Sequence, residues 1–221
     1  MVLRVLQGAG NSRDSLLLAR HELVDGVSAD VWLHNGEVYV HDEYRFAPLR
    51  FAVGRGGVRR GQPRRIPLDA VIDAVDARLL VLDVRAGGGD PAPDIARALY
   101  ALPDRSRFVV ACEELDLMDR LRAWQPDLPV AYAIPSEGAL RRYTQARMSD
   151  ALPPMAVIVP ETLLHTRLEL DSLAARATSV GVRNVRTAER ARELAAWGAH
   201  LVMASTLEAL VGVSEATSAQ V

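Results

Sequence analysis

The sequence predicts an α/β fold, a single (β/α)8 barrel of the TIM-barrel type. Short runs rich in Val, Leu and Ile alternate with amphipathic helical patterns along the chain, as in proteins whose βα units form a parallel sheet. The apolar runs are nearly continuous, which is expected of strands that are covered on both faces. Eight strand–helix units in 221 residues fit a compact barrel with short loops.

The elements follow one another in regular alternation. Their Val, Leu and Ile content predicts strands at residues 2–6, 26–32, 79–84, 107–112, 129–133, 156–159, 182–185 and 200–203. Amphipathic spacing predicts helices at residues 15–24, 68–75, 91–102, 115–124, 137–148, 161–179, 188–197 and 206–213. An open doubly wound sheet is the alternative. A Gly-rich phosphate loop after the first strand would favour it, and Gly8, Gly10 and Asn11 form only a weak version of such a loop.

One segment, residues 35–67, interrupts the alternation. Asn35 and Gly36 form a two-residue turn signal with β-rich flanks, which predicts a hairpin with a return strand at 37–41. The Arg- and Gly-rich stretch at 55–65 predicts either a mobile basic flap over an anionic substrate or a solvated loop. Without a linker or an internal repeat, we expect one domain over residues 1–213 and a frayed tail at 214–221.

Composition narrows the classes of function. Hydrophobic residues make up 49% of the chain and the net charge is −2, which argues against non-specific binding to nucleic acid or to an acidic membrane surface. A single cysteine, Cys112, excludes an intramolecular disulfide and a cysteine-only metal site. No apolar run reaches about 18 residues, so no integral membrane segment is expected, and a cytoplasmic protein is the simplest expectation. The oligomeric state is left open.

Strand periodicity gathers polar residues at one end of the predicted barrel. Ser28 and Asp30 are two residues apart and share a face of their strand, and Asp83 and Arg85 share a face of the next one. In such barrels the site lies at the carboxyl ends of the strands, so Asp30 and Asp83 should aim at one region. Two carboxylates with waters could hold Mg²⁺ or Ca²⁺ weakly. The alternative is an ion pair of Asp83 with Arg85 or another strand-end arginine, without a metal.

Residues 27–42 resemble a diagnostic segment of the glycerophosphodiester phosphodiesterase family. In that family a strand carries Glu-x-Asp, a hairpin with a turn glycine follows, and the return strand ends in His-Asp. Here Asp30 matches the Asp, Ser28 stands in place of the Glu, and His41 with Asp42 forms the closing pair. Further segments resemble the family in order along the chain, at residues 66–72, 80–85, 111–114, 126–129, 181–185 and 197–203.

The resemblance implies a barrel that hydrolyses a small glycerophosphodiester in lipid and glycerol metabolism, with a divalent cation (Mg²⁺ or Ca²⁺). The family's acid positions correspond to Ser28, Asp30 and Asp83, so Asp30 and Asp83 become the candidate metal ligands. His41 matches one of the two catalytic histidines. Gln7 replaces the other, and it can orient a water or a phosphoryl oxygen but cannot act as a base. The candidate substrate contacts are Arg45, Arg85 and Ser28.

Several departures from the family pattern leave a second hypothesis open. The first histidine, the phosphate-binding arginine after it and the first metal-binding glutamate are all replaced. A catalytically inactive or repurposed barrel could bind a small anionic ligand or run another reaction in the same pocket. Against this, His41, Asp42, Asp30 and an acid at position 83 remain. Glu113, after the fourth strand, could supply a replacement carboxylate or simply be a solvated residue at a helix start.

Overall fold

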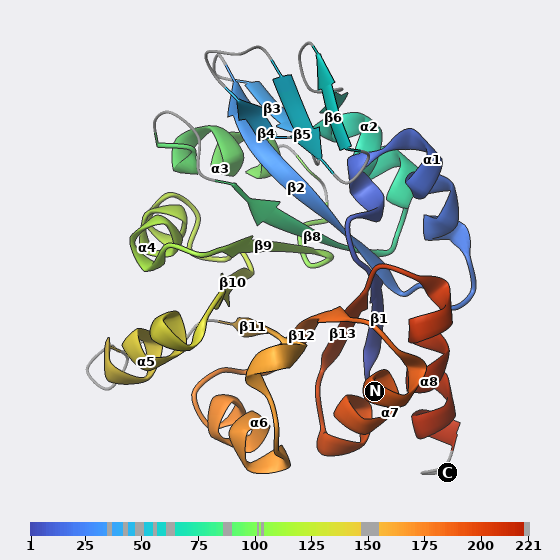
Figure 1. The fold of residues 1–221 in the computed structure, drawn as a ribbon. Helices are drawn as coiled ribbons and strands as arrows, with labels where there is room; N and C mark the ends of the chain where they lie inside the picture. Colours follow the sequence, from blue (N-terminus) through green and yellow to red (C-terminus); the bar gives the residue numbers. More distant parts are fainter. Residues whose placement is uncertain are drawn as a thin grey trace.

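The computed structural model describes residues 1–34, 37–41, 44–46, 51–54, 57–60, 65–85, 90–100, 102, 104–146 and 155–218. Its centre is a closed barrel of eight parallel strands (Figure 1). Neighbours pair in the order β1-β13-β12-β11-β10-β9-β8-β2, and β1 closes the ring by pairing with β2. The strands are β1 (Leu3–Leu6), β2 (Gly26–His34), β8 (Leu79–Val84), β9 (Phe108–Cys112), β10 (Val130–Ala133), β11 (Ala156–Pro160), β12 (Ser179–Val185) and β13 (Leu201–Ala204). The (β/α)8 barrel expected from the sequence is therefore confirmed.

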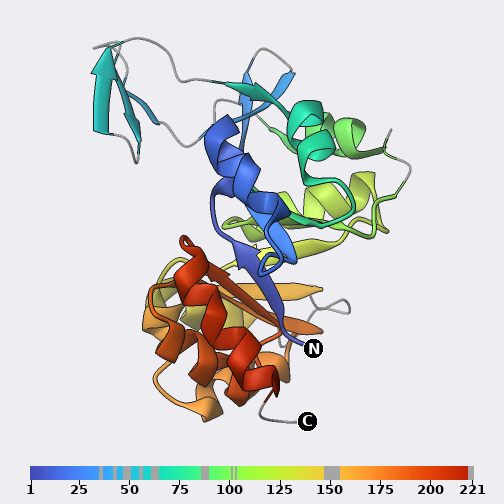
Figure 2. The same cartoon turned by 90° about the vertical axis from the view of Figure 1, so that its right-hand side faces the viewer.

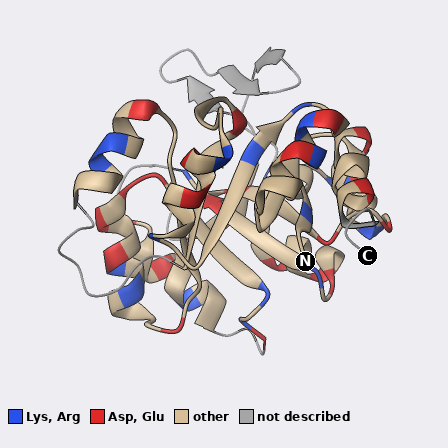
Figure 3. Cartoon of the chain, turned by 90° about the horizontal axis from the view of Figure 1, so that it is seen from below, with Lys and Arg blue, Asp and Glu red and all other residues tan. Residues whose placement is uncertain are grey.

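The helices form the outer layer. They are α1 (Arg13–Leu16), α2 (Leu68–Val75), α3 (Ala92–Tyr100), α4 (Leu115–Trp124), α5 (Glu137–Ala146), α6 (Arg167–Ala174), α7 (Ala188–Trp197) and α8 (Leu207–Ser218), with short 3-10 turns η1 (Ala9–Asn11), η2 (Leu17–Arg20) and η3 (Glu161–Leu163). Acidic residues and arginines alternate along the helices of this layer (Figure 3). None of the described helices is long and apolar enough to span a membrane.

Two hydrophobic layers follow from the two-residue period of the strands. Residues that point inward fill the barrel, among them Val5, Val81, Ala131 and Ile158. Their sequence neighbours point outward and pack under the helices, as Leu80 and Leu82 do on β8. The near-continuous apolar strands thus reflect burial on both faces, as the sequence indicated.

Helices α7 and α8 lie side by side (Figure 2). A Cβ added at Gly212 of α8 would lie 1.8 Å from the backbone oxygen of Ala188, so only glycine permits this approach. Thr187 accepts a hydrogen bond from the backbone of Arg190 at the start of α7, and Gly198 ends that helix with a φ of 103°.

Several predicted boundaries were wrong for local reasons. The helix expected at 161–179 is the turn η3 followed by α6, because Thr166 and Glu169 form a capping box that starts a new helix. Strand β12 consequently begins at Ser179. The helix expected at 15–24 is only α1 and η2.

The expected tail at 214–221 is also corrected, because α8 continues to Ser218. The guanidinium of Arg4 donates a 2.8 Å hydrogen bond to the hydroxyl of Ser214, which holds this last part of the helix against β1. Residues 219–221 lie outside the described chain.

The interrupting segment contains more strand than expected. Strand β3 (Glu37–Val40) pairs antiparallel with β2, as the hairpin prediction required, and β7 (Ile66–Pro67) pairs with β3. The stretch at 55–65, expected as a flap or loop, contains β6 (Gly57–Arg60), which joins β4 (Tyr44–Phe46) and β5 (Phe51–Gly54) in a three-stranded antiparallel sheet. The turn residues Asn35 and Gly36, together with 55–56 and 61–64, lie outside the described residues.

Candidate functional site

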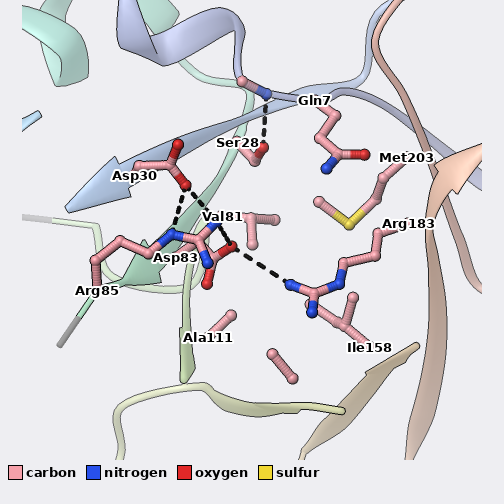
Figure 4. Close-up of a pocket in the computed structure, with 12 residues that line it drawn as sticks. Gln7, Ser28, Asp30, Val81, Asp83, Arg85, Ala111, Ile158, Arg183 and Met203 are labelled. Atoms are coloured by element: carbon pink, nitrogen blue, oxygen red, sulfur yellow. Dashed lines mark hydrogen bonds and ion pairs between the residues drawn. The ribbon is translucent and has the colours of Figure 1, made fainter. Parts of the chain in front are cut away.

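Polar side chains form the last inward-facing layer at the carboxyl ends of the barrel strands (Figure 4). Asp83 stands two residues beyond Val81 and Gln7 two residues beyond Val5, and both of these valines are in the barrel interior. The pocket that they enclose is lined by Gln7, Gly8, Ser28, Asp30, Val81, Asp83, Arg85, Ala111, Ala133, Ile158, Arg183 and Met203. Its position is the one that active sites occupy in this class of barrel.

Asp30 and Asp83 lie in register on the paired strands β2 and β8, and one guanidinium joins them. Nη2 of Arg85 is 2.6 Å from Oδ1 of Asp30 and 2.7 Å from Oδ2 of Asp83. Nε of Arg85 donates a further hydrogen bond of 2.9 Å to Asp30. The backbone N–H of Arg85 donates to the carbonyl of Val31, so the arginine is still aligned with β2 beyond the end of β8.

A second arginine, Arg183 of β12, approaches from across the barrel. Its Nη1 is 3.6 Å from Oδ2 of Asp83 and its Nη2 is 3.2 Å from Oε1 of Glu113. Glu113 also lies 3.7 Å from Nη1 of Arg85. Glu113 is therefore not merely solvated: it is the third carboxylate of an alternating network of acids and guanidinium groups.

Asp30 is held from its other side by Asn11. The side-chain amide of Asn11 donates to Oδ2 of Asp30 at 2.7 Å, and its oxygen accepts from the backbone N–H of Asp30 at 2.6 Å. Ser28 accepts a 2.8 Å hydrogen bond from the backbone N–H of Gly8. Ser28 therefore fixes the end of β1 and is 5% exposed, although it also lines the pocket.

Gln7 makes a reciprocal pair with Asn184 across the mouth. Its amide donates to the side chain of Asn184 and its oxygen accepts from the backbone N–H of Asn184, both at 2.8 Å. Asn184 has a φ of 62°, an uncommon conformation that asparagine tolerates better than most residues. The register of β12 shifts at this point, between Val182 and Val185.

His41 is buried beside β2 and does not line this pocket. Its ring stacks on Trp32 with centroids 4.9 Å apart and only 6% of the residue is exposed. The indole N–H of Trp32 donates to the carbonyl of His41, and the backbone N–H of His41 donates to the carbonyl of Asp30. His41 is not among the residues that line the pocket of Asp83 and Arg183.

Asp83 is the titratable group most perturbed by this environment. Burial raises its pKa to about 6; the charge of Arg85 opposes the rise and that of Asp30 adds to it. Oδ1 of Asp83 and Nε of Arg183 are both buried and have no hydrogen-bond partner among the residues that the structure describes. The site thus contains one unsatisfied buried acceptor and one unsatisfied buried donor.

The cation expected at Asp30 and Asp83 does not fit this arrangement. Both oxygens of Asp30 are engaged, by Arg85 and Asn11. Oδ2 of Asp83 faces two guanidinium groups. Within the described ranges, no three His, Cys, Asp or Glu side chains are placed to hold a metal ion. The alternative of an aspartate–arginine ion pair is the one that the geometry favours.

Two expected site residues cannot be placed. Arg45 is on β4, whose side chains lie outside the described part of the structure, and Asp42 is outside it altogether. Three contacts were missed from the sequence: Asn11, Arg183 and Asn184. The sequence did contain a signal for Arg183. Residues two apart on a strand share a face, so a charged residue two positions after Gly181 in a buried strand must point into the barrel mouth.

Comparisons with known proteins agree on the fold. No family model matches the sequence, and no curated protein matches it. Solved structures do match: a glycerophosphodiester phosphodiesterase from Thermotoga maritima superposes with a TM-score of 0.71 at 15% identity, covering 96% of this chain and 97% of its own. One from Parabacteroides distasonis gives 0.72 at 11% identity, with 98% of each chain covered. An Oleispira antarctica phosphodiesterase, in complex with the product sn-glycerol-3-phosphate, gives 0.70 at 13% identity, covering 98% of this chain and 96% of its own.

These similarities extend over nearly the whole chain. They confirm, at the level of the fold, the resemblance to glycerophosphodiester phosphodiesterases that the sequence indicated.

Proposed function

We propose that this chain is a divergent glycerophosphodiester phosphodiesterase-like protein that binds the phosphate group of a small glycerophosphodiester at the barrel mouth and hydrolyses it weakly. One observation carries the proposal: Arg85 and Arg183 converge on one strand-end pocket in a barrel that superposes on phosphodiesterases of this kind over nearly its full length. Its role would be in the breakdown of glycerolipid headgroups.

Phosphate recognition is the better supported half of the proposal. A guanidinium presents several donors in one plane and binds phosphate oxygens in pairs, with hydrogen bonds stronger than those between neutral groups. Nε of Arg183 is buried without an acceptor among the described residues, so a phosphoryl oxygen would complete its hydrogen bonding. The ligand of the Oleispira antarctica protein, sn-glycerol-3-phosphate, is a small anion of this type.

Hydrolysis should be slow because neither position that carries a catalytic histidine in the family supplies a proton carrier to the pocket. Water attacks phosphorus, the bond to the leaving alcohol breaks, one proton leaves the water and one reaches the departing oxygen. Gln7 cannot move a proton, and His41 is buried against Trp32 and is not among the residues that line the pocket. Loss of a general acid–base group commonly lowers the rate by about 10²–10⁴-fold.

A second candidate is a barrel that binds the same anion without turnover. The observation that favours it is the reciprocal pair of Gln7 and Asn184. Both polar atoms of the Gln7 amide are used in that pair, which leaves its side chain little capacity to position a water.

The two candidates are separated by measuring binding and turnover on the same samples. We would titrate the protein with glycerophosphoethanolamine by calorimetry and follow release of glycerol 3-phosphate. Binding should weaken at least about tenfold in Arg183→Met, since a charge-assisted bidentate contact is lost. In Arg142→Met it should be unchanged, because Arg142 lines neighbouring grooves of the mouth and not this pocket.

Turnover is then compared with restored variants. The change Gln7→His, which adds a side chain that can carry a proton, should raise a measurable baseline. Binding without turnover in all variants would support the second candidate. Absence of saturable binding in the wild-type protein would refute both.

A further inference from the structure

Three carboxylates converge at the barrel mouth from consecutive strands. Asp30 is on β2, Asp83 is on β8, and Glu113 directly follows β9. Like charges gathered in a partly buried site repel one another unless a cation is placed among them. In proteins, oxygen ligands that close on one point commonly hold Ca²⁺ or Mg²⁺, whereas these three acids close on arginine side chains and are not placed to hold a metal ion.

Here the positive charge is supplied by the chain itself. Arg85 is within ion-pair distance of all three acids, at 2.6 Å from Asp30, 2.7 Å from Asp83 and 3.7 Å from Glu113. Arg183 approaches two of them from the opposite wall, at 3.6 Å and 3.2 Å. Figure 4 shows the two guanidinium groups on either side of Asp83.

We propose that the guanidinium of Arg85, supported by Arg183, occupies the place of a divalent cation among Asp30, Asp83 and Glu113, so that the pocket works without a metal. The inference goes beyond the proposed function and does not depend on it, because it concerns how the acids are neutralised whether or not a phosphodiester is the ligand.

The geometry explains why a free cation would not compete. Arg85 follows Asp83 by two residues in the same chain, and its backbone N–H donates a hydrogen bond to β2. The guanidinium is therefore held beside the acids and cannot diffuse away. A divalent cation entering beside it would meet a like charge at about 4 Å; at an effective dielectric constant of about 20, repulsion between charges of +2 and +1 weakens binding by roughly 10⁶-fold. The side chain of Asp30 would also have to give up Asn11 or Arg85 to free an oxygen.

The inference predicts a gain of metal binding when the arginine loses its charge. Wild-type protein and Arg85→Met, both stripped with a chelator, are titrated with Ca²⁺, Mg²⁺ and Mn²⁺ by calorimetry at neutral pH, without any phosphodiester. The wild type should show no saturable binding. Arg85→Met should bind at least one of these ions saturably, with an affinity at least about tenfold above the weakest that the titration detects, because the like charge is gone. The gain should disappear when Asp30→Asn is added.

Arg142→Met is the matched control, because Arg142 is another arginine of the mouth that does not line the pocket of Asp30 and Asp83. It should gain nothing. Arg85→Gln, which keeps a polar group, is the second variant if Arg85→Met does not fold, and circular dichroism is recorded for each.

Two results would overturn the inference. One is saturable binding of a divalent cation by the wild type that is abolished by Asp30→Asn. The other is a folded Arg85 variant that gains no cation affinity. The wild-type titration decides by itself if neither variant folds. Failure of the proposed function would give a different result. The protein would not bind a phosphodiester, and the cation titrations would be unchanged.

Discussion

Replacing Asp83 by asparagine tests the balance between burial and ion pairing in the pocket. Burial raises the pKa of Asp83 to about 6 from its ordinary value of 3.8, even though Arg85 and Arg183 favour the ionised form. Only 15% of the side chain is exposed, so solvent screens little of this effect. At about 1.36 kcal/mol for each pKa unit, the change corresponds to about 3 kcal/mol.

The direction in which the free energy of unfolding changes with pH follows from proton binding. A carboxyl whose pKa is higher in the folded protein than in the unfolded chain binds its proton more tightly when folded. Its contribution to the free energy of unfolding is fully present below about pH 4 and is lost as the pH rises through about 6. Asparagine cannot ionise, so the free energy of unfolding of Asp83→Asn minus that of the wild type should rise by about 3 kcal/mol across this window.

The assay is urea unfolding of both proteins at several values between about pH 4 and pH 8, with the difference taken at each pH. Asp25→Asn is the control, whose difference should stay flat from about pH 4 to pH 8 and change only at more acid pH. Burial disfavours the ionised form of Asp25, but the hydrogen bonds and charge of Arg4 outweigh it and lower its pKa. Asp25 therefore stabilises the protein above its ordinary pKa and loses that contribution toward acid pH. If the Asp83 difference is flat or falls with pH, the arginines win over burial and our account of the pocket is refuted.

Three further predictions concern packing, the base of the barrel and ligand binding. Gly212→Ala should lower the free energy of unfolding by about 3 kcal/mol or more, since its Cβ would overlap α7, whereas Gly138→Ala, whose Cβ would make only ordinary van der Waals contacts at 3.8 Å and 3.9 Å, should be neutral or slightly stabilising; urea unfolding measures both. Arg4→Met should cost about 2 kcal/mol in the same assay, because its guanidinium donates two hydrogen bonds of 2.9 Å to the carboxylate of Asp25. In calorimetric titrations, the affinity for a phosphodiester should rise as the pH falls through about 6, because Asp83 becomes neutral while the ligand keeps its one negative charge. The affinity of Asp83→Asn should be the same above and below this pH.

The strands were predictable because their chemistry is uniform. Burial on both faces forces continuous apolar runs, and the two-residue period then fixes which side chains enter the barrel. That reasoning placed Asp30 and Asp83 on neighbouring strands, and the structure has them in register. Helix boundaries were less predictable, since capping by Thr166 and the hydrogen bond from Arg4 to Ser214 depend on local and long-range contacts that amphipathic spacing does not report.

The partners of the site residues could not be predicted, because they come from distant parts of the chain. Asn11 meets Asp30 only after η1 turns back over β2, and Gln7 meets Asn184 across 177 residues. A match to a family motif gives the type and order of residues along the chain. It does not say which groups each side chain contacts in the fold. His41 illustrates this, because its position in the motif suggests catalysis while the ring is stacked on Trp32.

The two arginines of the mouth have different capacities to receive an anion. Arg85 is committed to three carboxylates and would have to leave them to bind phosphate in full. Arg183 has longer contacts and a buried Nε that no described residue accepts from. The acids outnumber these arginines by one when Asp83 is ionised, so an anion is favoured only where a donor remains available to it. We therefore expect Arg183 to be the main contact for a phosphate, with Arg85 holding the acids apart so that the anion can approach.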